Sequence, residues 1–179
     1  MNATEFTIPT GRLVKLEHEH GSLLNVFLAE FAAGLSEMHG YFLPFDTPFE
    51  TVVETLEAQS HGDKLPAGWV PQSTWFWLGE GEIQGVINLR HHLTPALEAF
   101  GGHIGYTVAP TKRRRGVATA MLKAVLPLSR SLGIEKLLVT CDTENLGSIA
   151  AIERNGGVLE KVEWTESLQR KTRFYWITL

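Results

Sequence analysis

Four consecutive cations, Lys112 to Arg115, precede Gly116 where the sequence pattern changes from a strand, residues 103–108, to a helix. Cations beside a helix N-terminus oppose the helix dipole, which costs about 0.3–1 kcal/mol each, so a purely structural role does not explain them. An anion bound there reverses the sign of this interaction, because free backbone N–H groups and guanidinium groups both face it. Gly116 has no Cβ, so the backbone can approach a phosphate closely. The run therefore predicts a phosphate- or pyrophosphate-binding turn.

A cationic run is also typical of a solvated patch, a nucleic-acid contact or a localisation signal. The chain has 16 Lys and Arg against 20 Asp and Glu, which gives a formal net charge of −4. No broad basic field therefore surrounds the run, and nucleic-acid binding through it is disfavoured. A dinucleotide-binding dehydrogenase is disfavoured too, because the glycines of residues 101–105 precede a strand instead of opening a helix.

Two segments resemble one known family. The first resembles the acetyl-CoA signature of the GNAT N-acetyltransferase superfamily and reads Val108-x-Pro110-x-x-Arg113-x-x-Gly116-x-Ala118. The second resembles the next conserved block of that superfamily, with spacing closest to the branch of the ribosomal-protein N-terminal acetyltransferases, and reads Asn145-x-x-Ser148-x-x-x-Ile152-Glu153-x-x-Gly156. The blocks come in the family's order, and the resemblance covers residues 101–160. Residues 101–106, followed later by residues 139–142, also resemble a subfamily known mostly as predicted acetyltransferases.

The resemblance implies an α+β fold of α/β-like appearance, the GNAT fold, with a mixed central sheet of about six or seven strands flanked by helices. It implies one acetyltransferase domain over residues 1–179. Within it, residues 1–100 form the acceptor-side half, residues 101–160 the acetyl-CoA-binding core and residues 161–179 the closing strands. Composition agrees with one domain, because 179 residues at 44% hydrophobic can bury a sizeable core.

The sequence predicts a cytoplasmic protein without a membrane partner. No apolar run approaches the length of a membrane span, and the first residues lack the pattern of a signal peptide. Cys141 is the single cysteine, which excludes an intramolecular disulfide and is consistent with the reducing cytosol. No paired histidine supports a nucleophilic role for it. Dimers are common in the resembled family, so a homodimer is left open.

The activity implied by the resemblance is acetyl-CoA-dependent transfer of an acetyl group to a primary amine, by direct transfer in a ternary complex. The acceptor is a small molecule or a peptide. The resemblance places the diphosphate of coenzyme A on backbone N–H groups of the cationic turn, and the pantetheine arm along the preceding strand. The implied cofactor-binding residues are Tyr106, Val108, Arg113, Arg114, Arg115, Gly116, Val117, Ala118, Thr119, Asn145 and Ser148. A non-catalytic acyl-CoA-binding or regulatory module on the same fold is the alternative.

Catalytic residues are less clearly indicated. Ile152 stands where many members of the family carry the tyrosine that protonates the departing thiolate. The proton therefore comes from Ser148 or from water, or the thiolate leaves without one. His103 is the first candidate for the base, because its ordinary pKa lies near neutrality and its strand lines the thioester. Glu98 and Glu82 are weaker candidates, and a hydrogen-bonded structural role for His103 is the alternative.

The N-terminal half is expected to recognise the acceptor. Its aromatic residues can wall an amine site or belong to the core, and they are Tyr41, Phe42, Phe45, Trp69, Trp75 and Trp77. Asp46 or Glu50 can attract a cation, and Arg90 can bind a carboxylate. No metal is expected, because His91 and His92 are neighbours on a predicted strand and point to opposite faces.

Hydrophobic periodicity predicts strands over residues 12–16, 73–78, 83–92, 103–108, 136–141, 158–164 and 173–178, and helices over residues 22–33, 49–59, 117–132 and 146–154. Ser22 is the expected cap of the first helix, Asn145 caps the last one, and Gly156 is its left-handed stop. Pro127 is expected to kink the long helix. The resemblance implies that the strand of residues 103–108 diverges from the next one, and Gly105 either allows a β-bulge there or marks tight packing.

Overall fold

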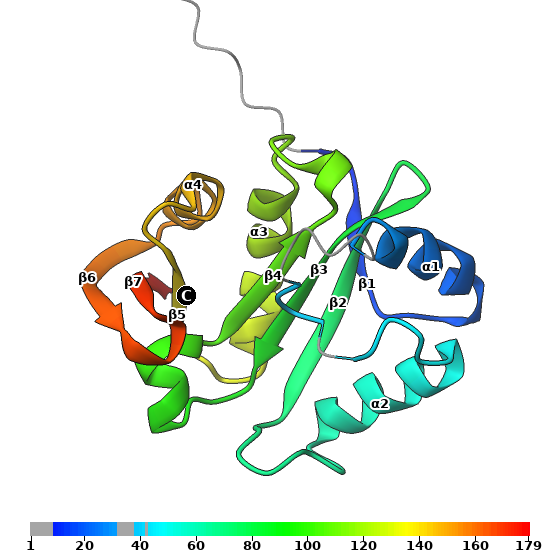
Figure 1. Ribbon diagram of the computed structural model, residues 1–179, viewed down its shortest axis with the longest axis horizontal. Coiled ribbons are helices and arrows are strands. Elements are labelled where there is room, and N and C mark those ends of the chain that lie inside the picture. Colours follow the sequence, from blue (N-terminus) through cyan, green and yellow to red (C-terminus); the bar gives the residue numbers. More distant parts are fainter. Residues whose placement is uncertain (1–8, 32–37, 42) are drawn as a thin grey trace, which may run out of the picture.

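The computed structural model describes residues 9–31, 38–41 and 43–179. In that part of the chain seven strands form two antiparallel sheets, with helices packed against them (Figure 1). The first sheet has the order β1-β2-β3-β4, with bounds Arg12–Val14, Gln72–Gly79, Glu82–Arg90 and Ile104–Val108. The second has the order β5-β7-β6, with bounds Lys136–Asp142, Arg170–Thr178 and Val158–Thr165. The helices α1 to α4 span Gly21–Ala29, Phe49–His61, Val117–Ser131 and Leu146–Arg154.

Apolar side chains of β2 and β3 point alternately to the two faces of the first sheet, so the core is divided between these faces. Phe76 and Val86 belong to one apolar cluster with residues of α1 and α2. Trp77 and Ile87, one position further along each strand, belong to a second cluster with residues of α3 and β5. Successive side chains of a strand point to opposite faces, so α1 and α2 cover one face and α3 covers the other (Figure 1).

The two sheets are joined at the start of β4 and separate toward its end. His103 donates its backbone N–H to the Leu138 carbonyl at 2.7 Å, and its Nδ1 accepts the Leu138 N–H at 2.9 Å. Gly102 permits this approach, because a Cβ there would lie 2.6 Å from the Leu138 carbonyl oxygen. Between the described residues of β4 and β5 proper, no backbone hydrogen bond forms. The expected divergence of β4 from the next strand along the chain is therefore present.

The α+β fold class is confirmed, although the strands divide between two sheets instead of forming one. The β2–β3 hairpin turns at Glu80 and Gly81, both in the left-handed region with φ 54° and 77°. Asn145 caps α4, since its Oδ1 accepts the Ser148 N–H at 3.0 Å, and Gly156 follows that helix with φ 83°. The first and last residues of the helices and strands lie within a few positions of the predicted ones.

The start of the first helix was predicted wrongly. Ser22 does not cap α1, which begins one residue earlier and follows directly on a short helical turn, His18–His20. That turn is closed by a hydrogen bond of 2.9 Å from the Glu17 N–H to Nδ1 of His20. The helix ends at Ala29 with Glu30 as its C-cap, before the predicted end, which lies outside the described residues.

Gly105 does not form a β-bulge, because the register between β3 and β4 is continuous. A Cβ at this position would lie 3.2 Å from the backbone nitrogen of Gly40, so the glycine serves the tight packing that was the alternative. The long helix α3 continues through Pro127, and a kink at that residue stays a prediction.

Candidate functional site

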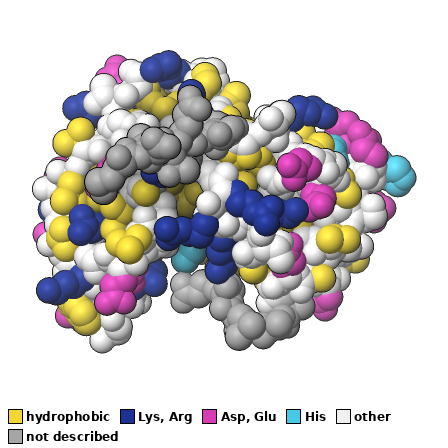
Figure 2. Space-filling model, turned by 90° about the horizontal axis from the view of Figure 1, so that it is seen from above, with side chains coloured by type: hydrophobic (Ala, Val, Ile, Leu, Met, Phe, Trp, Pro, Cys, Tyr) yellow, Lys and Arg dark blue, Asp and Glu magenta, His cyan; other side chains and the backbone are white. Residues whose placement is uncertain are grey.

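A cavity of about 910 Å³ lies where β4 and β5 separate, between the N-termini of α3 and α4. The structure brings to it nearly all residues predicted to bind the cofactor, namely Tyr106, Val108, Arg113, Arg114, Gly116, Val117, Ala118, Thr119, Asn145 and Ser148. Arg115 is exposed and does not line it. Figure 2 shows Lys and Arg side chains gathered around the middle of this face of the molecule.

The cationic turn leaves backbone N–H groups free at the start of α3. Gly116 is the N-cap with φ 85°, and no side chain caps the helix. The first helical hydrogen bond runs from the Ala120 N–H to the Gly116 carbonyl at 3.0 Å. The three preceding amides, at residues 117–119, therefore have no acceptor within the helix, and all three residues line the cavity. Such amides form an anion-binding site, and the helix dipole favours negative charge there.

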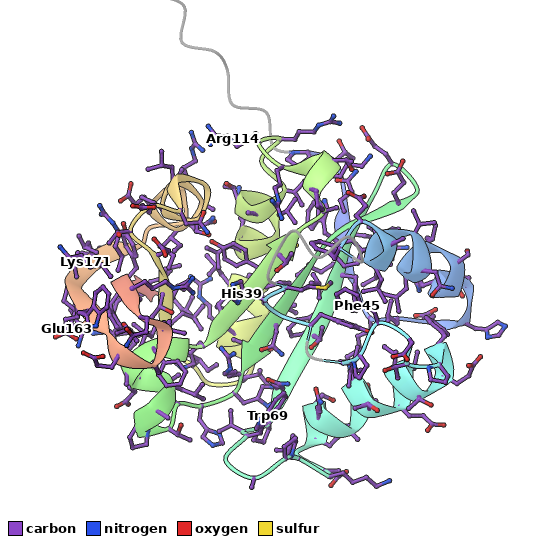
Figure 3. All side chains as sticks on the ribbon, in the orientation of Figure 1. His39, Phe45, Trp69, Arg114, Glu163 and Lys171 are labelled. Atoms are coloured by element: carbon purple, nitrogen blue, oxygen red, sulfur yellow. The ribbon has the colours of Figure 1, made fainter. Side chains whose placement is uncertain are left out.

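The turn is held in place from several sides. Arg114 adopts φ 63°, a left-handed conformation that costs a non-glycine residue roughly 1–2 kcal/mol. Arg113 donates from Nε to the Val108 carbonyl at 3.3 Å. Lys112 pairs with Glu82 at 2.6 Å. These contacts fix the turn at the wall of the cavity, which Arg114 also lines, at the end of the molecule where Figure 3 labels it.

The edge of β4 that faces β5 presents unpaired backbone groups. Ala109 donates its N–H to the Gln84 carbonyl at 2.9 Å, which fixes the phase of the β3–β4 ladder. In an antiparallel pair, hydrogen-bonded positions alternate with positions whose N–H and C=O point outward. Thr107 is therefore bonded to β3, whereas Tyr106 and Val108 turn their backbone groups toward the cavity. An extended ligand can pair with this edge as an added strand.

The second conserved block begins where β5 passes into α4. Asn145 and Ser148 line the cavity from the first turn of α4, and the Asn145 side chain is used as the helix cap. Ile152 lies one turn further along and is fully buried in the core. No tyrosine hydroxyl therefore enters the cavity from this helix position.

Sequence reasoning missed the polar residues on the other side of β4. His39 donates its backbone N–H to Oγ1 of Thr107 at 2.6 Å, and both residues line the cavity. Figure 3 shows His39 beside β4. Thr107 and Tyr106 point to opposite faces of β4, so the cavity reaches both faces around the free edge. His39 belongs to an irregular segment without periodicity, and no pattern in the sequence indicated it.

Acidic and basic side chains at the end of β5 complete this side of the cavity. Asp142 accepts the Glu144 N–H at 2.7 Å through Oδ1, and its Oδ2 lies 3.6 Å from Nε of Arg170. All three residues line the cavity, as does Arg154. Asp142 could have been found from the sequence, because it directly follows a buried strand, where α/β folds collect ligand-binding side chains.

His103 does not line the cavity. It is 6% exposed at the junction of the two sheets, where its Nδ1 accepts the Leu138 N–H. Burial, together with the charges of Arg90 and His92, lowers its pKa to about 4. The imidazole is therefore neutral at neutral pH and its lone pair is used by the backbone. This geometry does not support His103 as the base, and it favours the structural role that was the alternative.

The acceptor residues expected in the N-terminal half also lie elsewhere. Tyr41 is buried in the core, and Trp69 is 38% exposed toward the opposite end of the molecule from Arg114 (Figure 3). Arg90 donates from Nη1 to two loop carbonyls, Gly101 and Gly102, at 3.1 Å each, so it holds the chain before β4. The predicted residues that do not line the cavity are Tyr41, Phe45, Trp69, Trp75, Trp77, Asp46, Glu50, Arg90, Glu82 and Glu98. Phe42 lies outside the described residues.

Other reactive side chains have ordinary structural surroundings. Nε2 of His91 lies 2.9 Å from Oγ of Ser73. Burial raises the pKa of the Cys141 thiol to about 11. Among the residues that the structure describes, no three His, Cys, Asp or Glu side chains are grouped so as to hold a metal ion. Within the same ranges, every helix is too short or too polar to cross a membrane.

The sequence matches a family model, and the fold is similar to that of solved acetyltransferases. The model of the acetyltransferase (GNAT) domain matches residues 24–158. The sequence matches no curated protein. RimJ of Mycobacterium smegmatis, solved in complex with a CoA disulfide, has a TM-score of 0.67 and 16% identity, covering 94% of this chain and 85% of that one.

Two further solved structures are similar. MccE, the microcin C7 self-immunity acetyltransferase in complex with acetyl-CoA and AMP, has a TM-score of 0.65 and 15% identity, covering 93% of this chain and 91% of that one. The Salmonella typhimurium enzyme that modifies the N-terminal serine of ribosomal protein L7/L12 has a TM-score of 0.66 and 18% identity, covering 93% of this chain and 94% of that one. At these identities the likeness is one of fold.

Proposed function

Because this chain belongs to the GNAT acetyltransferase family, we propose that it transfers an acetyl group from acetyl-CoA to a primary amine, by direct attack in a ternary complex. One observation carries the proposal. The free amides at the start of α3 and the unpaired edge of β4 meet in a single cavity, which also opens to the other face of β4. An anionic, extended donor and a separate acceptor can therefore meet there.

The residues of the cavity fit coenzyme A. The amides of residues 117–119 hold the diphosphate, and Arg113 and Arg114 add positive charge. The outward backbone groups of Tyr106 and Val108 pair with the amides of the pantetheine arm. Asn145 and Ser148 approach the thiol end from α4, as the family resemblance implies. Acetyl-CoA, when bound, supplies the acetyl group as an activated thioester.

Arg114 and Arg115 are expected to differ in their effect on binding. Arg114→Ala removes a guanidinium that lines the cavity, so the Kd for acetyl-CoA should rise about 10-fold, as for one charge-assisted contact. Arg115→Ala removes an equal charge from a neighbouring exposed position outside the cavity, and the Kd should change less than about twofold. Isothermal titration of both variants at one salt concentration checks this. Equal losses would show that only the overall charge of the run matters.

The acceptor amine approaches from the side of His39 and Asp142. The carboxylate of Glu144 favours an ammonium group near the cavity, whereas that of Asp142 faces Arg170. His39 is the imidazole that lines the cavity among the described residues, so we propose that it removes the proton that the amine must lose. A protein or peptide amine is the acceptor class that we propose, since a neighbour of similar fold modifies an N-terminal serine.

His39→Gln is expected to lower kcat about 10- to 100-fold, the usual contribution of a positioned base. The acidic limb of the pH profile of kcat should disappear at the same time. His18→Gln, at an exposed histidine outside the cavity, is the matched control and should behave as the unchanged protein. A pH profile that keeps its acidic limb in His39→Gln would contradict the assignment.

Amine-dependent release of the coenzyme A thiol tests the proposed function directly. A panel of primary amines should include peptides with a free N-terminal serine, and at least one member should release thiol in proportion to the product formed. Binding of acetyl-CoA without release by any amine would favour the non-catalytic module, which Ile152 at the usual tyrosine position keeps open. The cytoplasmic location expected from the sequence stays a prediction. The homodimer that the sequence leaves open is tested by light scattering of the purified chain.

A further inference from the structure

Tyr106 carries a buried hydroxyl that no described residue satisfies. Its backbone lines the cavity from β4, and its ring packs against the core between β4 and α3. The hydroxyl oxygen is buried and has no hydrogen bond of normal geometry with the described part of the protein. A buried hydroxyl without a partner costs roughly 1–3 kcal/mol, so this group calls for an explanation.

Ser148 is a polar neighbour of that hydroxyl, and both residues line the cavity. Burial raises the pKa of Tyr106, and Ser148 opposes the rise as a hydrogen-bonding neighbour would. The backbone N–H of Ser148 is already bonded to Asn145, whereas no hydrogen bond of its hydroxyl is formed with the described residues. Ser148 itself lines the cavity. Two neighbouring residues at the wall of the cavity therefore carry hydroxyl groups that have no acceptor among the described residues.

We propose that Tyr106 is a positioning residue that acts through Ser148. Its hydroxyl donates a hydrogen bond to Oγ of Ser148, which directs the Ser148 proton into the cavity toward the sulfur of the thioester. This inference rests on the proposed function. Tyr106 on β4 would provide the tyrosine hydroxyl that is missing from α4, where Ile152 stands. One rotation about the Ser148 side-chain bond completes the pair, since that side chain has three staggered positions.

The pair stabilises the charge that develops when the thioester breaks. The amine nitrogen forms a bond to the acetyl carbon, the carbon–sulfur bond breaks, and its electron pair moves to sulfur. Ser148 donates a hydrogen bond to that sulfur, and Tyr106 strengthens Ser148 as a donor. The amine gives its proton to His39, and the thiolate takes one from water on release, so both hydroxyls keep their protons. The raised pKa of Tyr106 agrees with this, because its hydroxyl stays protonated throughout catalysis.

Steady-state kinetics of Tyr106→Phe, Ser148→Ala and the double variant test the proposal. Tyr106→Phe should lower kcat about 10-fold and leave the KM for acetyl-CoA within about twofold. The hydroxyl stabilises only the transition state, in which negative charge develops on the sulfur. The loss should be the same factor across about pH 6.5–9.5, since no ionisation of Tyr106 is involved. Ser148→Ala should lose at least as much, and the double variant should be no slower than Ser148→Ala alone.

Two controls separate this role from a structural one. Tyr175→Phe removes the same atom from another buried tyrosine, whose hydroxyl bonds to Glu153 outside the cavity, and its kcat should be unchanged. Ser148→Thr keeps a hydroxyl and should retain most of the activity. Full kcat in Tyr106→Phe, or losses that multiply in the double variant, would overturn the inference while leaving the proposed function intact. A wild-type protein that transfers no acetyl group would overturn both.

Discussion

Replacing Gly116 with Asp is expected to raise the Kd for acetyl-CoA at least about 100-fold, or about 2.7 kcal/mol. The new carboxylate would stand at the N-cap of α3, beside the free amides of residues 117–119, and would occupy the place proposed for the diphosphate. Repulsion between the two anions adds to the loss. The left-handed backbone, with φ 85° at Gly116, also disfavours any side chain by about 1 kcal/mol. Isothermal titration of wild type and variant measures the change.

Gly133→Asp is the matched control for this variant. Gly133 follows the other end of α3 with φ 77°, and no atom lies within 4 Å of a Cβ built there. The substitution therefore brings the same backbone penalty and the same charge, away from the cavity. Its melting temperature should fall at least as much as that of Gly116→Asp, because a carboxylate at the C-terminal end of α3 opposes the helix dipole, while its Kd for acetyl-CoA should change less than about twofold. A comparable loss of binding in both variants would show that strain, and not the anion site, is responsible.

The free energy of unfolding should fall by about 2–3 kcal/mol between pH 7 and pH 4 because of His103. The folded chain binds a proton at this residue only near its lowered pKa of about 4, whereas the unfolded chain binds one near the ordinary value of 6.5. The contribution is therefore fully present above the ordinary pKa and is lost as the pH falls toward 4. Urea unfolding at a series of pH values, followed by Trp fluorescence, measures this slope.

Two substitutions isolate the contribution of His103. Asn at this position keeps an acceptor near the place of Nδ1, so His103→Asn should preserve the bond to the Leu138 N–H and flatten the pH dependence. His103→Leu leaves that buried N–H without a partner and should cost about 1–3 kcal/mol at pH 7. An unchanged slope in His103→Asn would assign the pH dependence to other groups.

The turn that leaves the first amides of α3 uncapped was accessible to sequence reasoning because its signals are local. Four cations and a glycine stand where the hydrophobic period changes from that of a strand, 2, to that of a helix, 3.6. This local pattern predicts uncapped amides at the helix start, whatever the rest of the fold. The cap at Asn145 and the stop at Gly156 were local for the same reason, since each depends on residues a few positions away. Such features follow from the chemistry of one short segment.

The structure does not support His103 as the base, because its surroundings depend on a contact that is distant in sequence. His103 was placed at the thioester from its strand alone. In the structure the N–H of Leu138, 35 residues away, donates to Nδ1 of His103 and joins the two sheets there. His39 reaches the cavity through a bond to Thr107, 68 residues away. Neither contact leaves a period or a motif in the sequence. The place where β4 and β5 separate decides which side chains share the cavity.

Titration of acetyl-CoA into the purified chain, followed by calorimetry at near-physiological salt, tests the central claim most directly. We expect binding with one site per chain and a micromolar Kd, weakened by added salt because charge-assisted contacts hold the diphosphate. Gly116→Asp should abolish the heat under the same conditions. No binding by the wild type at millimolar acetyl-CoA, or equal binding by Gly116→Asp, would contradict the assignment of this cavity.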